Sequence, residues 1–561
     1  MRPLNRRDLL SASFVSAAAA LTGCAAIPTD GEVNHYADPR NTASPTEAID
    51  TPAGPVPGAT PAEIIDGFLH AGVGANDDYS VARLFLTESL AESWRPDGQT
   101  LIYNSSVITE ETGQDTFMVT VPTSTLVDGR GLATSYTEAT ENELEFTLQQ
   151  VEGEWRVATA PDGTVLSRTE FGEVFSPFTL YFYDPTFTQA VPDVRWFVER
   201  PTVATSLVKV LLEGPAPYLE GGVITAIPPN TTLARNSVTV ENGRADVQLS
   251  GGPSLQSASA LDLERLRTQL TQTLSNIASI TSTQLSINNQ VINTQDLENY
   301  REPAINAEVP PFVLGVENNR LVMRDNLSAS ENQSLVFAQN GVAPAQPAMN
   351  YSRTSFSFTA ADRSELWLAT LSEAQVVHRG VGILQPSYDH QNWLWIAQED
   401  GSVLTLAAGQ RGAEPRTLET WLHGQTLLSL AVARDGARVA LVTSTDGATS
   451  AWISAIRRAE DGVPLGLLDP VQVGADISPD GVEWVSDEDV ILWNTTTAET
   501  EIVSLTGQST RYDNLPDIEH IVTGNGVDQV VATNKTGTLF IVAGNGWTRI
   551  ESSLSALNYS G

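Results

Sequence analysis

The chain has 561 residues, of which 41% are hydrophobic, enough for three or four globular domains with cores of their own. Its formal net charge is −37 at pH 7, from 31 lysines and arginines against 68 aspartates and glutamates. A field of that sign repels nucleic acid and anionic lipid head groups, so we expect no nucleic-acid partner and no direct adsorption to a membrane.

Residues 1–23 have the pattern of a bacterial export signal, in which an Ala-rich apolar run leads to a small-residue cleavage site. The run is shorter than the roughly 20 residues of a membrane span. It ends in Leu21, Thr22, Gly23 and Cys24, which resemble a lipobox. In such signals the cysteine receives a diacylglycerol and becomes the mature N-terminus. We therefore predict Cys24, the only cysteine of the chain, as the lipidation site.

Arg6 and Arg7 stand just before the apolar run, and together with its weak hydrophobicity they resemble the recognition pair of a twin-arginine signal. The general secretory route is the alternative. A lipobox cysteine carries at least two acyl chains, which hold a protein stably at a bilayer, whereas one chain binds only marginally. We therefore predict a protein anchored by lipid to the extracytoplasmic face of the cell membrane.

Residues 24–59 are rich in Pro, Gly and small polar residues, a composition that cannot bury enough apolar surface to order itself. We interpret them as a flexible linker. The α+β domain expected over residues 60–175 begins with a capping box, Thr60 to Glu63, that starts a helix. A second helix is expected over 81–90.

Strand-like runs with β-branched and aromatic residues follow these helices. They lie at 116–121, 144–148 and 154–157. Helices first and an antiparallel sheet afterwards indicate an α+β domain. The last of these strands, with the turn that follows it, resembles the end of the cone-shaped domains related to nuclear transport factor 2.

A second α+β domain is expected over residues 176–301. Helices are predicted at 202–212 and 261–277 from apolar residues at three- and four-residue spacing. The predicted strands are 178–182, 194–200, 223–228, 237–240, 245–249 and 284–287. Asn242-Gly243 is a strong hairpin signal between two of these strands.

Three motifs of this second domain have a fairly specific order and spacing. They are Leu211 to Pro215, Ala226 to Thr231, and Asn242 to Ser250. Together they resemble the GerMN domain, which is named for spore germination proteins and occurs in envelope lipoproteins. The resemblance covers about 100 residues and implies the α+β fold of that domain.

Residues 302–561 contain a repeat. Short polar corners, each followed by a strand-like run, recur at spacings of 37 to 46 residues. The corners are Ser352, Asp389, Asp435, Asp480 and Asn525. Such a period is typical of the four-stranded blades of a β-propeller. We predict an all-β propeller of five to seven blades, with Asp435-Gly436 and Asp480-Gly481 in equivalent turns.

The usual catalytic motifs are missing. The chain contains no His-Glu-x-x-His and no Gly-x-Ser-x-Gly, and its sole cysteine is assigned to the lipid. Glu143 and Glu145 share one strand face, and Asp487, Glu488 and Asp489 are consecutive. We interpret both groups as solvated faces rather than as the carboxylate pair of a glycosidase. We predict no catalytic residue, no cofactor and no enzyme activity.

Metal sites are weakly indicated. His378 and His390 could approach each other across a blade junction, and Asp476, Asp480 and Asp487 lie near blade corners. The aspartates lack the spacing of a known calcium loop. We therefore expect surface or capping roles for these side chains and no bound metal.

Trp393, Trp395 and Trp484 could stack on sugars. They alternate within apolar runs, so we expect them to pack between blades instead.

The order of lipobox, linker, α+β domain, GerMN domain and propeller resembles that of the actinobacterial lipoprotein LpqB family, over nearly all of the mature chain. Members of that family are linked to the extracytoplasmic side of the MtrAB two-component system, through its sensor kinase. The resemblance therefore implies an accessory protein that modulates such a kinase and binds its extracytoplasmic domain. The alternatives are a cell-wall glycan-binding protein and a propeller hydrolase.

Overall fold

The computed structural model describes residues 52–561 except 294–296, 298–299, 326, 328–341, 371 and 411. Residues 52–561 form one compact unit. Cys24, its lipobox and the Arg6-Arg7 pair lie outside the described residues, so the anchor and the export route stay predictions. Within the described part of the chain, every helix is too short or too polar to cross a bilayer.

The N-terminal domain begins with helix α2 (Pro61–His70). The predicted capping box is confirmed, because the Thr60 side chain accepts from the backbone N–H of Glu63 while the Glu63 carboxylate accepts from Thr60 N at 2.8 Å. The buried face of α2 carries Ile64, Ile65 and Phe68.

The second helix expected over 81–90 is wrong as a single element. The chain forms two short helices, α3 (Ser80–Arg83) and α4 (Glu88–Ser93), on either side of an isolated bridge between Leu86 and Val157. Backbone hydrogen bonds of 2.9 Å from Thr87 N to Val157 O and from Val157 N to Phe85 O straighten the chain there. Tertiary pairing thus overrides the helical pattern.

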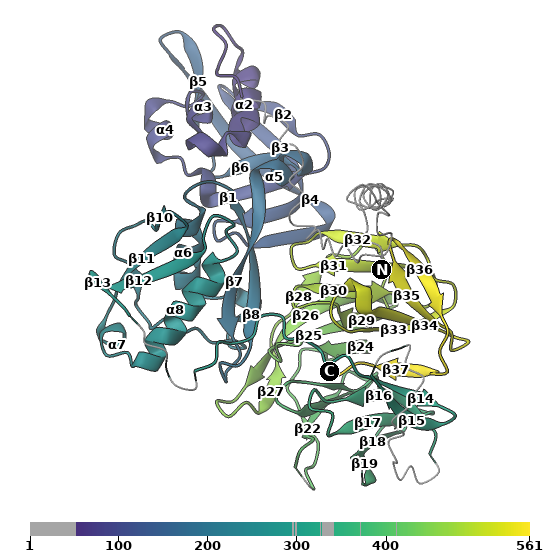
Figure 1. The fold of residues 1–561 in the computed structure, drawn as a ribbon. Coiled ribbons are helices and arrows are strands. Elements are labelled where there is room, and N and C mark those ends of the chain that lie inside the picture. The colour runs from purple at the N-terminus through teal and green to yellow at the C-terminus, as the bar shows by residue number, and fades with distance from the viewer. Residues whose placement is uncertain are drawn as a thin grey trace, which may run out of the picture. The chain divides into compact units, whose positions relative to one another are not determined.

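A six-stranded sheet lies against these helices in the order β5-β4-β3-β1-β6, with β2 paired to β3 (Figure 1). The strands are β1 (Gln99–Tyr103), β2 (Ile108–Gly113), β3 (Thr116–Asp128), β4 (Ala133–Val151), β5 (Glu154–Thr159) and β6 (Thr164–Ser167). Along β3 buried and half-buried residues alternate, as one covered face requires. Helix α5 (Arg168–Val174) leads into the next domain. The α+β class is confirmed.

The middle domain, predicted over residues 176–301, opens with the hairpin β7 (Phe175–Tyr183) and β8 (Ala190–Val198). Its other elements are α6 (Val203–Glu213), η5 (Pro217–Leu219), β9 (Thr232–Leu233), β10 (Thr239–Glu241), β11 (Arg244–Ser250), α7 (Pro253–Gln256), α8 (Ala260–Leu274), β12 (Ser282–Ile287) and β13 (Gln290–Val291). The predicted hairpin is confirmed: Asn242 and Gly243 have φ of 50° and 78° between β10 and β11.

The strand expected over 223–228 is wrong. The structure has only isolated bridges there, from Ile224 to Tyr183 and from Val223 to Glu220. The run is apolar because Val223 and Ile227 face the core of the domain, together with Leu207 and Leu270. Apolar content therefore indicated burial here and not a ladder of backbone hydrogen bonds.

In the described residues, the propeller consists of six sheets arranged as blades (Figure 1). Blade 1 contains β14 (Val313–Glu317), β15 (Arg320–Arg324) and β37 (Ala556–Asn558). Blade 2 contains β16 (Pro344–Met349), β17 (Phe356–Ala360), β18 (Glu365–Ala369) and β19 (Ala374–Arg379). Blade 3 contains β20 (Ser387–Tyr388), β21 (Trp393–Ala397), β22 (Val403–Ala407) and β23 (Arg416–Thr417).

The remaining blades follow in chain order. Blade 4 contains β24 (Thr426–Val432), β25 (Arg438–Thr445), β26 (Ala448–Arg458), β27 (Pro464–Leu467) and β28 (Val471–Val473). Blade 5 contains β29 (Gly481–Trp484), β30 (Asp489–Trp493), β31 (Thr500–Ser504) and β32 (Ser509–Tyr512). Blade 6 contains β33 (Ile518–Thr523), β34 (Val530–Asn534), β35 (Leu539–Ala543) and β36 (Gly546–Ile550).

The ring of blades is closed. The first strands β16, β20, β24, β29 and β33 contact one another in that order, and β37 contacts both β33 and β16. Strand β37 also pairs with β14, so the C-terminal strand completes the blade that begins the propeller. The propeller prediction is confirmed.

The repeat alignment is wrong at one corner. Ser352, Asp389, Asp435 and Asn525 each lie between the first and second strands of a blade, whereas Asp480 precedes the first strand of blade 5. Asp480 accepts a 2.9 Å hydrogen bond from Thr495 N, at the other end of its blade. Since Asp-Gly is a turn signal at either end of a strand, the short strand β29 made the two ends look alike in the sequence.

Candidate functional site

The turns that join the first and second strands of the blades lie at one end of the propeller, and the middle domain contacts this end. Within this end of the propeller lies an ion pair between Arg458 Nη2 and Asp389 Oδ2 at 2.5 Å, with both side chains fully buried. Arg458 comes from the end of β26 in blade 4, and Asp389 from the turn of blade 3. The pair therefore joins two adjacent blades.

Asp389 uses both carboxylate oxygens. Oδ1 accepts from the backbone N–H groups of Gln391 at 3.0 Å and Trp393 at 2.8 Å, and Oδ2 also accepts from the Trp395 indole at 3.2 Å. Arg458 further donates to Gly436 O at 2.7 Å. A buried pair with this many partners is well compensated for its lost hydration, and removal of either member leaves a charge without a partner.

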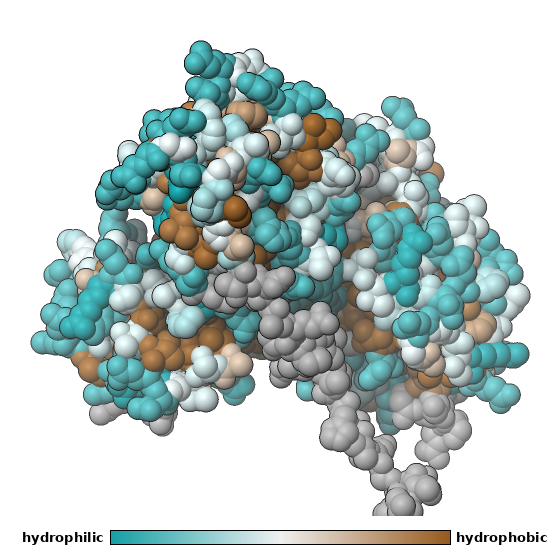
Figure 2. All heavy atoms as spheres, turned by 90° about the horizontal axis from the view of Figure 1, so that it is seen from above, coloured by the Kyte–Doolittle hydropathy of each residue, from teal (hydrophilic) through white to brown (hydrophobic). Residues whose placement is uncertain are grey.

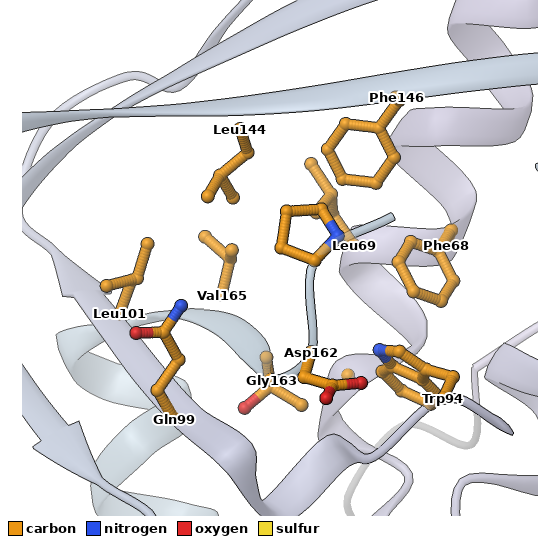
Figure 3. A pocket seen from close by; sticks show the side chains of 13 residues that line it. Phe68, Leu69, Trp94, Gln99, Leu101, Leu144, Phe146, Asp162, Gly163 and Val165 are labelled. Carbon is orange, nitrogen blue, oxygen red and sulfur yellow. The ribbon is translucent and has the colours of Figure 1, made fainter. Parts of the chain in front are cut away.

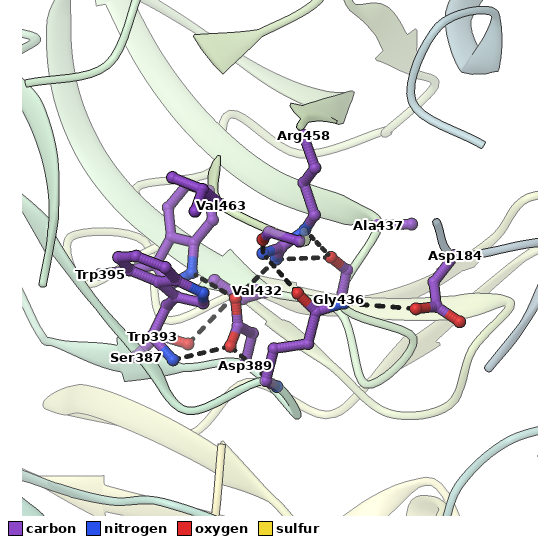
Figure 4. A network of polar contacts seen from close by, with 12 residues as sticks. Asp184, Ser387, Asp389, Trp393, Trp395, Val432, Gly436, Ala437, Arg458 and Val463 are labelled. Atoms are coloured by element: carbon purple, nitrogen blue, oxygen red, sulfur yellow. Dashed lines mark hydrogen bonds and ion pairs between the residues drawn. The ribbon is translucent and has the colours of Figure 1, made fainter. Parts of the chain in front are cut away.

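The middle domain joins this network through Asp184, in the turn between β7 and β8. Gln391 Nε2 donates to Asp184 Oδ2 at 3.2 Å, while Gln391 Oε1 accepts from Arg458 Nη1 at 3.1 Å. Figure 4 shows the resulting path from Asp184 through the propeller turn to Arg458 and Asp389. A continuous polar chain therefore runs from one domain into the interior of the other.

A second buried pair lies beside the first. Arg438 donates to Asp435 Oδ2 from Nε at 2.8 Å and to the backbone carbonyl of Asp487 from Nη2 at 2.6 Å. Its guanidinium also lies over the Trp484 ring, 4.9 Å from the centroid. This arginine thus ties the turn of blade 4 to the turn of blade 5.

Tyr218 of the middle domain packs against both the core of its own domain and the cluster between blades 4 and 5. Burial, and then nearby Asp193, raises the pKa of its phenol, so the group stays neutral. In the middle domain, Arg195 and Asp193 form a fully buried bidentate pair. Nε donates to Oδ1 at 2.7 Å and Nη2 donates to Oδ2 at 2.9 Å. Arg195 also donates to the carbonyl of Arg130 at 3.2 Å, which links in the N-terminal domain.

We call this contact the junction. It consists of the propeller turns at 389, 435 and 487 and of the residues of the middle domain that touch them. The backbones of the two domains also approach each other closely here. A Cβ on Gly222 would stand only 2.6 Å from that of Ala455 in β26. Thr179 of β7 donates to Glu488 at 2.7 Å. Ala437 and Ala455 belong to the apolar core of the middle domain. The junction therefore holds the two domains together by apolar and ionic contacts at once.

Arg434 lies in the same turn as Asp435 and is almost fully buried. It donates to the carbonyls of Val485 at 3.0 Å and Gly524, in blades 5 and 6. Burial lowers the pKa of this guanidinium. Burial raises the pKa of Glu483, on the first strand of blade 5, to about 7 against the opposing effects of a hydrogen bond from Trp484 N and of Arg434.

The interpretation of the 487–489 acids as a solvated face is wrong for Asp487, which is 7% exposed within the junction. Burial, and then neighbouring Glu488, raises its pKa to about 6, against the pull of Arg438 and Arg434. Glu143 and Glu145, by contrast, are exposed on β4 as expected. Sequence did not distinguish the two acidic groups, because the partners of Asp487 are distant in the chain.

The other candidate residues have separate surroundings. His378 Nε2 faces Gln398 Oε1 at 3.0 Å, whereas His390 stacks on Tyr351 with 3.7 Å between ring centroids. The structure therefore does not bring the two histidines together. Among the described residues no three His, Cys, Asp or Glu side chains are grouped as metal ligands would be.

The prediction for the tryptophans is confirmed. Trp395 and Trp484 are fully buried, each in an apolar cluster that joins neighbouring blades, and Trp393 packs against the same cluster as Trp395.

A separate cavity lies in the N-terminal domain, between α2 and the sheet (Figure 3). Phe68, Trp94, Leu101 and Phe146 line it, and Asp162 lies at its edge. Its volume is about 20 Å³, room for roughly one water molecule. It offers no space for a cofactor or a substrate as it stands.

We expect Asp184→Ala to lower the free energy of unfolding by about 1–3 kcal/mol, since it leaves several part-buried donors without an acceptor. The carboxylate accepts from Thr188 N and Gln189 N, each at 2.7 Å, besides Gln391. Urea unfolding followed by tryptophan fluorescence measures the change. Asp362→Ala is the control, because Asp362 is exposed and caps only its own turn. Equal costs for the two variants would contradict the assigned role of Asp184.

Family models cover the three folded domains. The model of the lipoprotein LpqB N-terminal domain matches residues 54–172, the model described as sporulation and spore germination matches 179–293, and the model of the lipoprotein LpqB beta-propeller domain matches 322–556. The sporulation and germination match coincides with the middle domain, in agreement with its resemblance to GerMN.

Relatives match over most of their length. Lipoprotein LpqB of Cutibacterium acnes is 27% identical over 506 residues, which cover 83% of this chain and 82% of the relative. Lipoprotein LpqB of Mycolicibacterium smegmatis is 24% identical over 522 residues, 87% of each chain. Among solved structures, TolB from Acinetobacter baumannii aligns with 55% of this chain and 86% of its own at 10% identity, with a TM-score of 0.35, a likeness too weak to carry an argument. Because the two LpqB models together match more than half of the residues and these relatives align with 83–87% of the chain, the chain belongs to the lipoprotein LpqB family.

Proposed function

We propose that this chain is a lipid-anchored envelope protein without catalytic activity, and that it modulates a two-component sensor kinase of the MtrAB type from the extracytoplasmic side. Membership in a family of lipoproteins supports the anchor, together with the lipobox that ends in Cys24. The kinase is the partner implied by the resemblance to that family.

The junction is the observation that carries the proposal. Two fully buried ion pairs, Arg458–Asp389 and Arg438–Asp435, lie where the middle domain meets the propeller. Because each carboxylate of these pairs already accepts from a guanidinium group, this end of the propeller acts as a structural joint rather than as a reaction site. The opposite end carries the turns between second and third strands, whose sequences can vary without disturbing the blades.

The charge of the molecule indicates the kind of partner surface. Acidic residues outnumber basic ones by 68 to 31. Hydrophilic and intermediate residues cover most of the face seen in Figure 2, with smaller apolar patches between them. An acidic protein of this kind complements a basic patch on the external domain of the kinase, and a membrane tether raises the effective concentration so that weak contacts suffice.

We expect residues 52–561 to bind the external domain of the kinase with micromolar affinity, and the affinity to fall roughly tenfold between low and high salt, since exposed charges are screened. Calorimetry at two salt concentrations measures this, and crosslinking in membranes tests the contact where it would occur. An unrelated protein of similar acidity is the control for non-specific attraction. No contact in either assay would refute the proposal and leave the glycan-binding and hydrolase readings.

A further inference from the structure

Asp487 is a buried carboxylate without a complete set of partners. It lies in the turn between β29 and β30, 7% exposed, and its Oδ2 atom accepts no hydrogen bond. The nearby Arg438 is fully buried, and its Nη1 atom likewise has no acceptor. Buried polar atoms of native proteins normally have partners, so an unpaired carboxylate oxygen here weakens the contact whenever it carries a charge.

The groups around this carboxyl come from three places. Glu488 is its neighbour in the same turn and accepts the hydrogen bond from Thr179 of the middle domain. Arg438 belongs to β25, and Arg434 and Asp435 to the turn before it. Two carboxylates therefore oppose the charge on Asp487, and two guanidinium groups favour it.

The two arginines do not compensate the charge on Asp487, because the hydrogen bonds that they donate go to other groups. Asp435 already accepts from Arg438 Nε at 2.8 Å, and Arg434 is directed to the carbonyls of Val485 and Gly524. Neither arginine places a donor on the Asp487 carboxylate. When ionised, this group is buried beside like charges and receives no hydrogen bond on Oδ2.

We propose that Asp487 makes the junction sensitive to acid: protonation of its carboxyl tightens the contact between the propeller and the middle domain, and ionisation loosens it. The device goes beyond modulation of a kinase and does not depend on it. It would let the outer pH set how firmly the two domains are joined.

The direction of the pH dependence follows from the linkage between proton binding and closure of the junction. The pKa of Asp487 is raised in the closed junction, so the closed form binds the proton more tightly than a form in which the turn is solvated. The contribution of the protonated Asp487 carboxyl to the stability of the closed junction is complete in acid and is lost as the pH rises through about 6. The difference from the ordinary value of 3.8 corresponds at most to a roughly hundredfold change in the open fraction.

Hydrogen exchange of the mature, lipidated protein in detergent tests this at pH 5.0 and pH 7.5, which lie on either side of the raised pKa of about 6. Peptides over 214–224 and 483–490 report on the junction, and helix α2 is the internal reference. After correction for the chemical exchange rate, we expect protection at the junction to be up to about tenfold higher at pH 5.0. Protection in α2 should change much less.

Three variants decide the assignment. Asp487→Asn should give the high protection at both pH values. Glu488→Gln keeps an acceptor for Thr179 but removes a like charge, so it should move the transition to lower pH. Glu143→Gln, on an exposed strand face, should behave as the wild type.

Equal protection of the junction at both pH values in the wild type would overturn the proposal, and so would a full pH dependence in Asp487→Asn. If Asp487→Asn does not fold, an unshifted transition in Glu488→Gln would overturn it by itself.

Discussion

Replacement of Arg458 by Met should lower the free energy of unfolding by about 3–5 kcal/mol, the cost of leaving a buried charge without its partner. The arginine donates to Asp389 at 2.5 Å, and both side chains are fully buried. Met has a similar length and fills the space, so the loss reports on the charge more than on a cavity. Urea unfolding of residues 52–561, followed by tryptophan fluorescence, measures it.

The preceding residue of β26 supplies the control. Arg457 pairs with Glu419, but their side chains are 43% and 82% exposed. A pair at the surface contributes only about 0–1 kcal/mol, so Arg457→Met should change little. The double variant Arg458→Met with Asp389→Asn should cost less than the sum of the two single changes, because each removes the same pair. Equal losses for the 457 and 458 variants would contradict the buried pair.

Replacement of Cys24 by Ala should abolish membrane attachment of the mature protein. The thiol of Cys24 is the only one in the chain, so no other residue can take the lipid at a lipobox. We expect the acidic protein not to adsorb to anionic lipid by itself, so without two acyl chains it should be released or stay an uncleaved precursor. Membrane fractionation with metabolic lipid labelling measures both outcomes.

Ala26→Ser, two residues downstream, is the matched control and should be labelled and fractionated as the wild type. Lipid labelling of Cys24→Ala at the wild-type level would show that the anchor lies elsewhere.

Features that depend on neighbours in the chain were predictable. The capping box from Thr60 to Glu63 satisfies backbone groups within four residues, and the Asn242-Gly243 turn needs only two residues that tolerate positive φ. The period of the propeller was readable because each blade repeats the same local pattern of short strands.

The sequence pattern failed where two distant segments compete with local preference. The pattern over 81–90 favours a helix, but the backbone of Val157 pairs with this stretch and divides it. The run over 223–228 is apolar enough for a strand, but it packs on a core without forming a ladder. In both cases the decision lies with residues far away in the chain.

Sequence alone gave the domain order, the family and the class of each fold, since these rest on local patterns and on resemblance, and the lipobox stays a prediction from the same kind of pattern. Only the tertiary structure decided the junction. Asp389 and Arg458 are 69 positions apart, and Asp184 is 207 from Gln391. The residue type of an acid does not say whether it is solvated or buried, so the burial of Asp487 and the exposure of Glu143 follow only from their surroundings. Burial and the distance to opposite charge set the energy of a carboxylate, and both arise only when the domains have folded together.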